Sequence, residues 1–334
     1  MTKTILVAGA TGHQGRALIR ALVGLDGPPE FRIFALTRTV SSSAAQRLST
    51  AYGDRVKVVE GDLDAPTTIR KVFEDAKQED GIWGVFCVLA FPGLGANADA
   101  EERQGKLLAD LAFEFGVSSF ILSTSERGGE YFDDDMKTLD RVAKVRIERH
   151  VKELGTKGLP WTLLRPGFFM ENYDGWLGAI TVGVLKAGLK PGTTNRIVAV
   201  DDIGRVAAAV FCNPSHYQAK ILTISDQVLT MSEQEAQYKR ATGRAMPTIP
   251  VILASAIIWM NVHTQELLAD LERMHNAREN GLCPEVIAQA QAAREACPEM
   301  HSLEAWAAER KDGLVEQEQN WNQVSLWQLL RGKL

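Results

Sequence analysis

Three glycines near the start of the chain have a spacing that suits phosphate binding. Gly9, Gly12 and Gly15 directly follow the apolar run 5–8, and an amphipathic helical pattern begins just after them. In a strand–turn–helix unit, such glycines allow a tight turn, a close approach of the backbone to a phosphate, and close packing of the helix on the strand. The helix N-terminus then offers N–H groups to the anion. We therefore predict a dinucleotide-binding turn here, with a tight turn that binds nothing as the alternative.

The end of the second predicted strand indicates which dinucleotide is bound. Proteins that prefer NAD usually carry Asp or Glu at this position, where it binds the ribose 2′-hydroxyl. This chain carries Arg38 instead, and a guanidinium can bind a 2′-phosphate through several donors. We therefore expect NADP(H) to be preferred over NAD(H), with an ordinary surface arginine as the alternative. Asp62, after the third predicted strand, suits a hydrogen bond to the adenine amino group or a helix cap.

A lysine in a later helical segment is the main candidate for chemistry. Lys144 follows Asp140 by four residues, so the two side chains share one helix face. Ordinary short-chain dehydrogenases carry tyrosine at the first position, and the nearby ammonium lowers the pKa of that phenol. An ionised Asp140 cannot donate a proton at neutral pH. Lys144 remains able to bind the nicotinamide ribose or to act itself, and a helix-stabilising ion pair is the alternative.

Charge and cysteine content argue against several functional classes. The net charge is −5 and the isoelectric point is about 5.8, whereas broad nucleic-acid binding requires a basic face. The four cysteines form no Cys-x-x-Cys pair, and no histidine cluster lies near them, so we predict no metal site. Cys87 and Cys212 lie in apolar segments and are expected in the core. This cysteine usage predicts a reducing compartment, the cytoplasm or also the nucleus.

No segment reads as a membrane anchor or a targeting signal. The first residues enter a strand directly, so no signal peptide is predicted. The longest apolar run, 249–262, is too short to span a bilayer and is expected to form a buried helix. A partner surface that includes Trp259 is the alternative interpretation of this run. The acidic segment 126–135 is predicted to be a solvated surface loop, with a loop that lies over the site as the alternative.

Alternating strand and helix patterns predict the fold. Strands are expected at 4–8, 32–37, 56–60, 84–90, 119–123, 162–165 and 221–225. Helices are expected near 14–24, 66–77, 100–115, 138–154 and 202–212. Repeated strand–helix–strand order indicates an α/β fold with a doubly wound parallel sheet of the Rossmann type.

The predicted sheet has a smaller, mainly helical lobe beside it. Residues 1–160 form the Rossmann core, and strands in 161–167 and 220–226 complete its sheet. Residues 168–219 and 227–334 form the lobe, over the carboxyl ends of the strands, where open α/β sheets bind ligands. Within the lobe, 232–235 is interpreted as a capping box that opens a helix, and Gly243 is expected to end that helix.

Several segments together resemble the NmrA-like family of atypical short-chain dehydrogenase/reductase proteins. The similar segments are 9–15, 37–38, 104–112, 144–148, 161–172 and 302–311. The run from Arg165 to Asn172 is specific, whereas the glycine motif alone is not. Because the segments are spread along the chain, the resemblance covers most of it.

The resemblance implies a bound NADP(H) or NAD(P) and a set of contacts to it. Phosphate and ribose contacts would come from Gly9, Thr11, Gly12, His13, Gln14 and Arg38. Asp62 and Leu63 would lie near the adenine. The nicotinamide end would be flanked by Ala90, Phe91, Lys144, Gly167 and Phe168.

The resemblance also implies two kinds of function. Some members of the family sense the NADPH/NADP⁺ balance and control partner proteins such as transcription regulators, and others reduce small molecules with a lysine as the key residue. Because Asp140 replaces the usual acid, we expect a redox-sensing regulator of a protein partner, with little or no catalysis. The alternative is an NADPH-dependent reductase or isomerase of a small apolar or aromatic substrate. Lys144 and Tyr173 would then be its catalytic residues.

Overall fold

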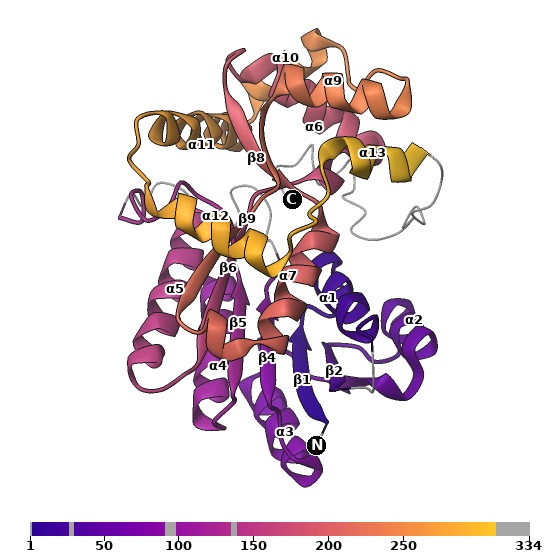
Figure 1. Ribbon diagram of the computed structural model, residues 1–334, viewed down its shortest axis with the longest axis vertical. Helices are drawn as coiled ribbons and strands as arrows, with labels where there is room; N and C mark the ends of the chain where they lie inside the picture. The colour runs from indigo at the N-terminus through magenta and orange to yellow at the C-terminus, as the bar shows by residue number, and fades with distance from the viewer. Residues whose placement is uncertain (1, 27–29, 91–97, 135–138, 312–334) are drawn as a thin grey trace.

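A seven-stranded parallel sheet forms the lower part of the molecule (Figure 1). The computed structural model describes residues 2–26, 30–90, 98–134 and 139–311. In spatial order the strands are β3 (Val56–Glu60), β2 (Phe31–Thr37), β1 (Lys3–Ala8), β4 (Gly84–Val88), β5 (Ser119–Ser123), β6 (Trp161–Pro166) and β9 (Lys220–Ile224). Every neighbouring pair is parallel. The strand order reverses between β1 and β4, which is where such sheets bind ligands.

Helices cover both faces of this sheet. One face carries α1 (His13–Val23), α2 (Ser43–Tyr52), α7 (Val200–Cys212) and α12 (Glu285–Ala296). The other carries α3 (Pro66–Ala76), α4 (Asp99–Glu114) and α5 (Leu139–Thr156). Residues 5–8 of β1 are all apolar because both faces of the strand are covered: Ile5 and Val7 face the first layer, while Leu6 and Ala8 face the second.

A second sheet forms the base of the upper lobe. Its strands, in spatial order, are β10 (Gln227–Thr230), β8 (Thr194–Val198) and β7 (Phe168–Phe169). The lobe helices are α6 (Gly175–Gly188), α9 (Met231–Thr242), α10 (Val251–Met260), α11 (Val262–Glu279) and α13 (Leu303–Lys311). Short helices are η1 (Gly53–Arg55), η2 (Lys77–Glu79), η3 (Met170–Tyr173) and α8 (Pro214–Tyr217). Figure 1 shows α6, α9 and α10 at the end of the molecule opposite α3.

The predicted fold class is confirmed, and the lobe differs from expectation in detail. The lobe contains a small sheet that the sequence patterns did not reveal. Residues 200–212 lie outside it, because α7 packs on α1 and on the large sheet. A Cβ atom added to Gly204 would lie only 2.3 Å from the Ala17 carbonyl carbon, so this glycine allows α7 to approach α1 closely. Helix α12 also returns to the large sheet and packs against β9.

The predicted capping box exists but begins two residues earlier. Thr230 accepts a hydrogen bond from the Glu233 N–H (3.3 Å), and the Glu233 carboxylate accepts one from the Thr230 N–H (2.8 Å). The difference arises because Thr230 ends β10 and has the extended backbone that an N-cap requires. Gly243 ends this helix in a left-handed conformation (φ 73°), as expected.

Two expectations about buried side chains are wrong. Cys87 is fully buried, but Cys212, the last residue of α7, is exposed. Helix α10 is apolar on all sides, and only one side packs on α6, which leaves Ile252 and Trp259 more than four-fifths exposed. Among the described residues, no single helix is long and apolar enough to cross a membrane, and only the sharply bent pair α10–α11 passes that test jointly.

Candidate functional site

The glycine turn after β1 has the geometry of a phosphate cradle. Gly9 has a positive φ of 78°, and a Cβ atom on it would lie 2.6 Å from the Val88 carbonyl oxygen. A Cβ atom on Gly15 would lie 2.3 Å from the Gly9 carbonyl oxygen. Both positions therefore require glycine. Gly12 is the N-cap of α1 and supplies no side-chain cap, so the N–H groups of the first turn face outward for an anion.

A hydrogen bond links this turn to the end of β5. The Ser123 hydroxyl donates to the Gln14 side-chain oxygen at 2.6 Å, and Ser123 is buried. His13 and Gln14 begin α1, and Thr11 lies in the turn before it. The structure thus brings the predicted phosphate contacts to the carboxyl ends of β1 and β5. Sequence analysis did not single out Ser123, although its place at the end of a central strand was visible.

Arg38 and Asp62 line the same groove beside β2, β3 and α3. The groove has a volume of about 450 Å³. Within the described segments, the exposed Arg38 forms no hydrogen bond or ion pair, so its guanidinium is available to a ligand. Asp62 accepts a hydrogen bond from the Asp64 N–H at 3.0 Å, which stabilises the turn before α3. Leu63 packs against the apolar layer below. The pair predicted to bind the adenosine end is therefore assembled.

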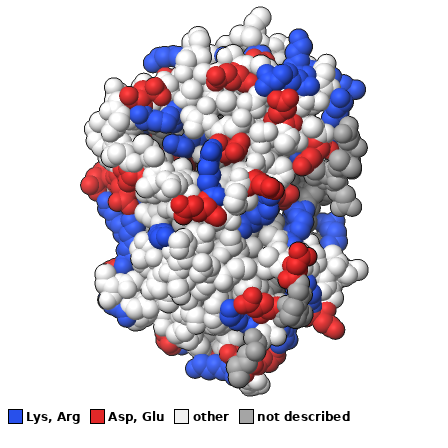
Figure 2. Space-filling view, in the orientation of Figure 1, with Lys and Arg blue, Asp and Glu red and all other residues white. Residues whose placement is uncertain are grey.

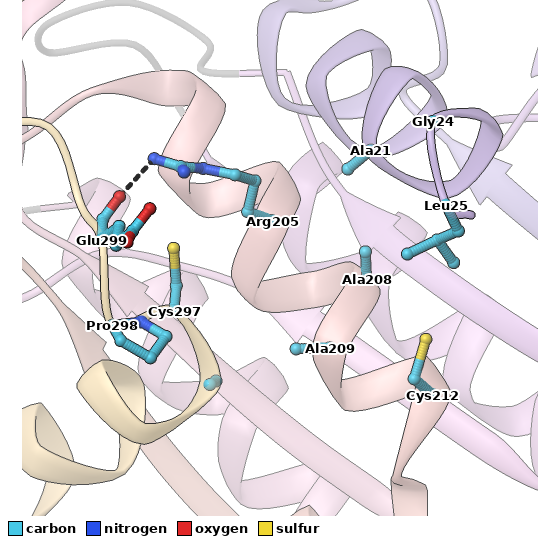
Figure 3. A pocket seen from close by; sticks show the side chains of 11 residues that line it. Ala21, Gly24, Leu25, Arg205, Ala208, Ala209, Cys212, Cys297, Pro298 and Glu299 are labelled. Carbon is cyan, nitrogen blue, oxygen red and sulfur yellow. Dashed lines mark hydrogen bonds between the residues drawn. The ribbon is translucent and has the colours of Figure 1, made fainter.

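A second groove lies away from all of these residues. It has a volume of about 550 Å³ and is formed by α1, α7 and the end of α12 (Figure 3). Ala208 and Cys212 line one part of it, and Arg205 donates to the Glu299 carbonyl oxygen at 2.8 Å in another. None of the predicted cofactor residues lines it.

Lys144 is held by a buried carboxylate that sequence analysis missed. Its ammonium lies 3.1 Å from Glu101, and both side chains are largely buried. Glu101 belongs to the first turn of α4, where the helix dipole stabilises a negative charge. Glu101 therefore positions the Lys144 ammonium, which can act as a cation toward a ligand. Phe91 and the Asp140 side chain lie outside the described residues.

The contact predicts a specific effect of replacing Glu101. In the Glu101→Gln variant the Lys144 ammonium loses the carboxylate that positions it, so we expect the turnover number to fall about tenfold, as for the loss of one hydrogen bond to a charged group. The neighbouring Glu102 pairs with Lys106 (2.6 Å) and Arg146 (3.0 Å) instead and provides a matched control. The Glu102→Gln variant should keep the wild-type turnover number. Equal turnover numbers for all three proteins would contradict a role of Glu101 in holding Lys144.

Gly167 and Phe168 lie where β6 leaves the large sheet and β7 joins the small one. The Gly167 N–H donates to the Ile224 carbonyl oxygen at 2.9 Å. A Cβ atom on Gly167 would lie 2.7 Å from the Arg196 carbonyl oxygen, so the strand crossing requires glycine. Ala90 follows β4 at the same edge of the sheet and is exposed. These three predicted residues therefore share the carboxyl edge of the strands.

Tyr173 does not face this edge. Its side chain is buried in the core of the lobe, and its hydroxyl donates to the Gln234 side-chain oxygen at 2.5 Å. Burial raises the pKa of the phenol. The expectation that Tyr173 offers a phenol to a substrate is therefore not met in this structure. The residue was selected because it follows the Arg165–Asn172 run, but the η3 turn directs its ring toward Phe168 and the lobe interior.

Glu171 joins the turn after β7 to two helices. Its carboxylate accepts hydrogen bonds from the Val200 N–H (3.1 Å), the Trp306 indole (3.1 Å) and Arg310 (3.3 Å). Burial raises the pKa of Glu171 to about 7, against the opposing effect of Arg310. Through its contacts with Trp306 and Arg310, the Glu171 carboxylate therefore holds α13 against the turn that follows Phe168.

A buried ion cluster fixes the loop after β5. Glu148 on α5 accepts from Arg127 (2.7 Å) and Arg165 (2.6 Å), and Asp133 also accepts from Arg127 (2.7 Å). The two arginines hold the pKa of Glu148 well below its usual range, despite its complete burial. Residues 126–134 are therefore partly an anchored segment, not the fully solvated loop that was predicted. Among the described residues, no group of three or more metal-binding side chains comes together.

Comparison with known proteins gives a consistent result. A model of the NmrA-like family matches residues 1–307. An NmrA-like family domain-containing protein of Dictyostelium discoideum is 25% identical over 238 residues, which cover 69% of this chain and 74% of the relative. The NmrA-like family domain-containing oxidoreductases ptmS of Penicillium ochrochloron and FrzB of Cladobotryum sp are 24% and 27% identical over 274 and 275 residues. These alignments cover 75% of this chain, and 76% and 77% of the two relatives.

Solved structures share the fold over almost the whole chain. NmrA, a negative transcriptional regulator, matches at 19% identity in complexes with NAD (TM-score 0.65) and NADP (TM-score 0.63), over 92% of this chain and 95% of the regulator. The triphenylmethane reductase of Citrobacter sp. complexed with NADP(H) matches at 14% identity and TM-score 0.64, over 92% of this chain and 99% of the reductase.

Proposed function

The chain belongs to the NmrA-like family of NAD(P)-binding, Rossmann-type proteins, and from this premise we propose that it is an NADPH-dependent oxidoreductase of a small organic substrate. The observation that carries the proposal is the Lys144–Glu101 pair, a buried, charge-compensated lysine on the helix that carries the catalytic lysine in short-chain dehydrogenases. The curated relatives named as oxidoreductases support it. They favour the catalytic alternative over the sensor that the sequence suggested.

In this proposal the chain's own residues bind and orient the cofactor, and they stabilise the charge that develops during the reaction. Bound NADPH supplies the hydride. The backbone of the turn around Gly12 receives its phosphates, and Gly9 and Gly15 leave the space that this approach requires. The Lys144 ammonium, held by Glu101, binds the ribose and stabilises the negative charge that develops on the substrate oxygen. Because Tyr173 is buried in the lobe, the proton comes from Lys144 or from water.

The preference for NADPH depends on Arg38. Replacing it with alanine removes a charge-assisted hydrogen bond to the 2′-phosphate, worth about 1.5–3 kcal/mol, so we expect NADPH affinity to fall about 10- to 100-fold. NADH lacks that phosphate, so the change removes at most one hydrogen bond to a neutral ribose hydroxyl. The affinity for NADH should therefore change less than about threefold. Isothermal titration of both proteins with both cofactors measures this. Tighter binding of NADH than NADPH to the wild type would refute the role of Arg38.

Turnover is the test of the enzyme proposal. Anaerobic oxidation of NADPH is followed with a panel of small carbonyl, enone and aromatic compounds. The apolar side chains Phe168 and Phe169, which follow β6, favour apolar or aromatic substrates. We expect substrate-dependent oxidation for at least one compound of this class. NADPH binding without oxidation across the panel would contradict the proposal.

A redox-sensing regulator is the second candidate. It is favoured by the burial of the Tyr173 phenol in the lobe, and by the fold shared with a negative transcriptional regulator. The partner would be a protein such as a transcription regulator in the cytoplasm or nucleus, without direct nucleic-acid contact. A sensor should bind its partner with an affinity that changes between NADPH and NADP⁺ and should show no turnover.

A further inference from the structure

Two arginines lie close together beside β8 of the small sheet, and among the described residues they share no ion-paired carboxylate. Arg196 lies on β8, and its guanidinium donates only to the Ser225 hydroxyl, at 3.3 Å. Arg278 on α11 donates to the carbonyl oxygen of Thr194 at 2.9 Å and to its hydroxyl. Thr194 and Arg196 are two residues apart on one strand, so their side chains share one face of it. Arg278 therefore holds its charge beside that of Arg196.

The acidic groups near this pair do not neutralise it directly. The negative charge of Glu126 opposes the lowering of the pKa of both arginines, yet its carboxylate accepts the Gly128 N–H at 2.8 Å and forms no ion pair with either. Arg278 reaches only the exposed Glu279, at 3.8 Å. Arg294, another positive neighbour, donates to the Asp226 carbonyl oxygen at 2.6 Å. The described residues therefore leave Arg196 without an ion pair.

Both guanidinium groups keep donors in reach of solvent. Both side chains are partly buried, and burial together with a neighbouring positive charge lowers the pKa of each. For Arg278 that neighbouring charge is Arg196, and for Arg196 it is Arg294. The nitrogen atoms that lack a partner are nevertheless not sealed inside the protein, unlike Nη1 of Arg165. A like-charged, half-buried pair with open donors is stabilised by an anion that bridges it.

The pair lies next to the edge of the sheet where the cofactor residues gather. Ser225 follows β9, and the preceding Ile224 carbonyl oxygen accepts the Gly167 N–H. The Arg196 backbone also lies close to Gly167, since a Cβ atom on Gly167 would be 2.7 Å from the Arg196 carbonyl oxygen. Figure 2 shows basic and acidic side chains interspersed over one face of the molecule, with no broad basic surface on that face.

We propose that Arg196 and Arg278, with the Ser225 hydroxyl, form a binding site for a small oxyanion, a phosphate or carboxylate group. Two guanidinium groups offer planar sets of N–H donors, and these match the oxygens of such groups in a bidentate way. The site is separate from the phosphate cradle at Gly12, and it does not depend on the proposed oxidoreductase activity.

Titration of the full-length protein with inorganic phosphate tests the site. Binding is measured by calorimetry and by thermal stabilisation, with chloride at equal ionic strength as the reference. We expect saturable binding of phosphate that the Arg196→Gln variant weakens at least tenfold, from the loss of a charged donor. The Arg196→Lys variant keeps the charge but loses the planar donors, so its affinity for phosphate should lie between that of the wild type and that of Arg196→Gln. Arg240, an exposed arginine paired with Glu304, provides the control Arg240→Gln, which should bind like the wild type.

Two further arms locate and identify the anion. Saturating NADP⁺ should leave phosphate binding unchanged if the site is separate from the cofactor, and competition would place the phosphate in the cofactor cleft and overturn the proposal. Phenyl phosphate that binds more tightly than inorganic phosphate would assign the anion to an organic ligand, and equal binding would assign it to a free ion. The absence of saturable binding in the wild type, or equal binding by Arg196→Gln, would also overturn it.

Discussion

We expect the turnover number of the Lys144→Met variant to be about 100- to 10,000-fold lower than that of the wild type. This is the usual contribution of a positioned acid or base. Methionine has a similar length and no charge, so the change removes the ammonium while it preserves most of the packing. The variant also leaves Glu101 as a buried carboxylate without its partner. Steady-state oxidation of NADPH measures the loss, and circular dichroism and thermal unfolding show whether the fold is kept.

A matched lysine from the same part of the chain provides the control. Lys157, just after α5, forms an exposed ion pair with Glu153, so Lys157→Met removes a charge far from the proposed site. Its turnover number should stay within about twofold of the wild type, because exposed ion pairs contribute about 0–1 kcal/mol to stability and nothing to the site. Equal activity of the Lys144→Met variant and the wild type would remove Lys144 from the mechanism.

The Glu148→Gln variant should be the least stable of the single substitutions considered. The change leaves the buried guanidinium groups of Arg127 and Arg165 without their shared carboxylate. Removing one partner from a buried ion pair costs about 3–5 kcal/mol. Denaturant unfolding measures the difference, with Glu153→Gln as an exposed control on the same helix. A loss below about 1 kcal/mol would mean that the cluster does not hold the loop after β5.

The same carboxylate predicts a dependence of stability on pH. The pKa of Glu148 is depressed in the folded protein, so the unfolded chain binds a proton before the folded chain does. Its contribution is therefore complete at neutral pH and is lost progressively as the pH falls below the ordinary range of a glutamate. The free energy of unfolding of the wild type should fall more steeply with acid than that of Glu148→Gln.

Local patterns were sufficient for the large sheet. Strands such as β1 are apolar on both faces because helices cover both, and the resulting continuous apolar runs are visible without any partner. The glycines of the first turn carry their own steric requirement, so the tight turn could be predicted from their spacing. The role of Arg38 stays a prediction from its place at the end of a strand.

Features that depend on distant partners were not visible. Strand β7 has only two residues, and it exists because Phe168 and Phe169 pair with β8, about thirty residues away. Helix α10 was expected in the core because it is apolar, but burial depends on which neighbours cover it. Glu101 becomes a site residue only when α4 meets α5, and no spacing rule joins it to Lys144.

Transfer of label from deuterated NADPH tests the central claim most directly. The protein is mixed anaerobically with NADPH that carries deuterium at the transferring position of the nicotinamide and with a substrate found in the panel. The account predicts one deuterium in each product molecule, stoichiometric with the NADP⁺ formed, and a much slower transfer in the Lys144→Met variant. A protein that binds NADPH tightly but leaves the label on the cofactor with every compound would contradict the account and would favour a sensor.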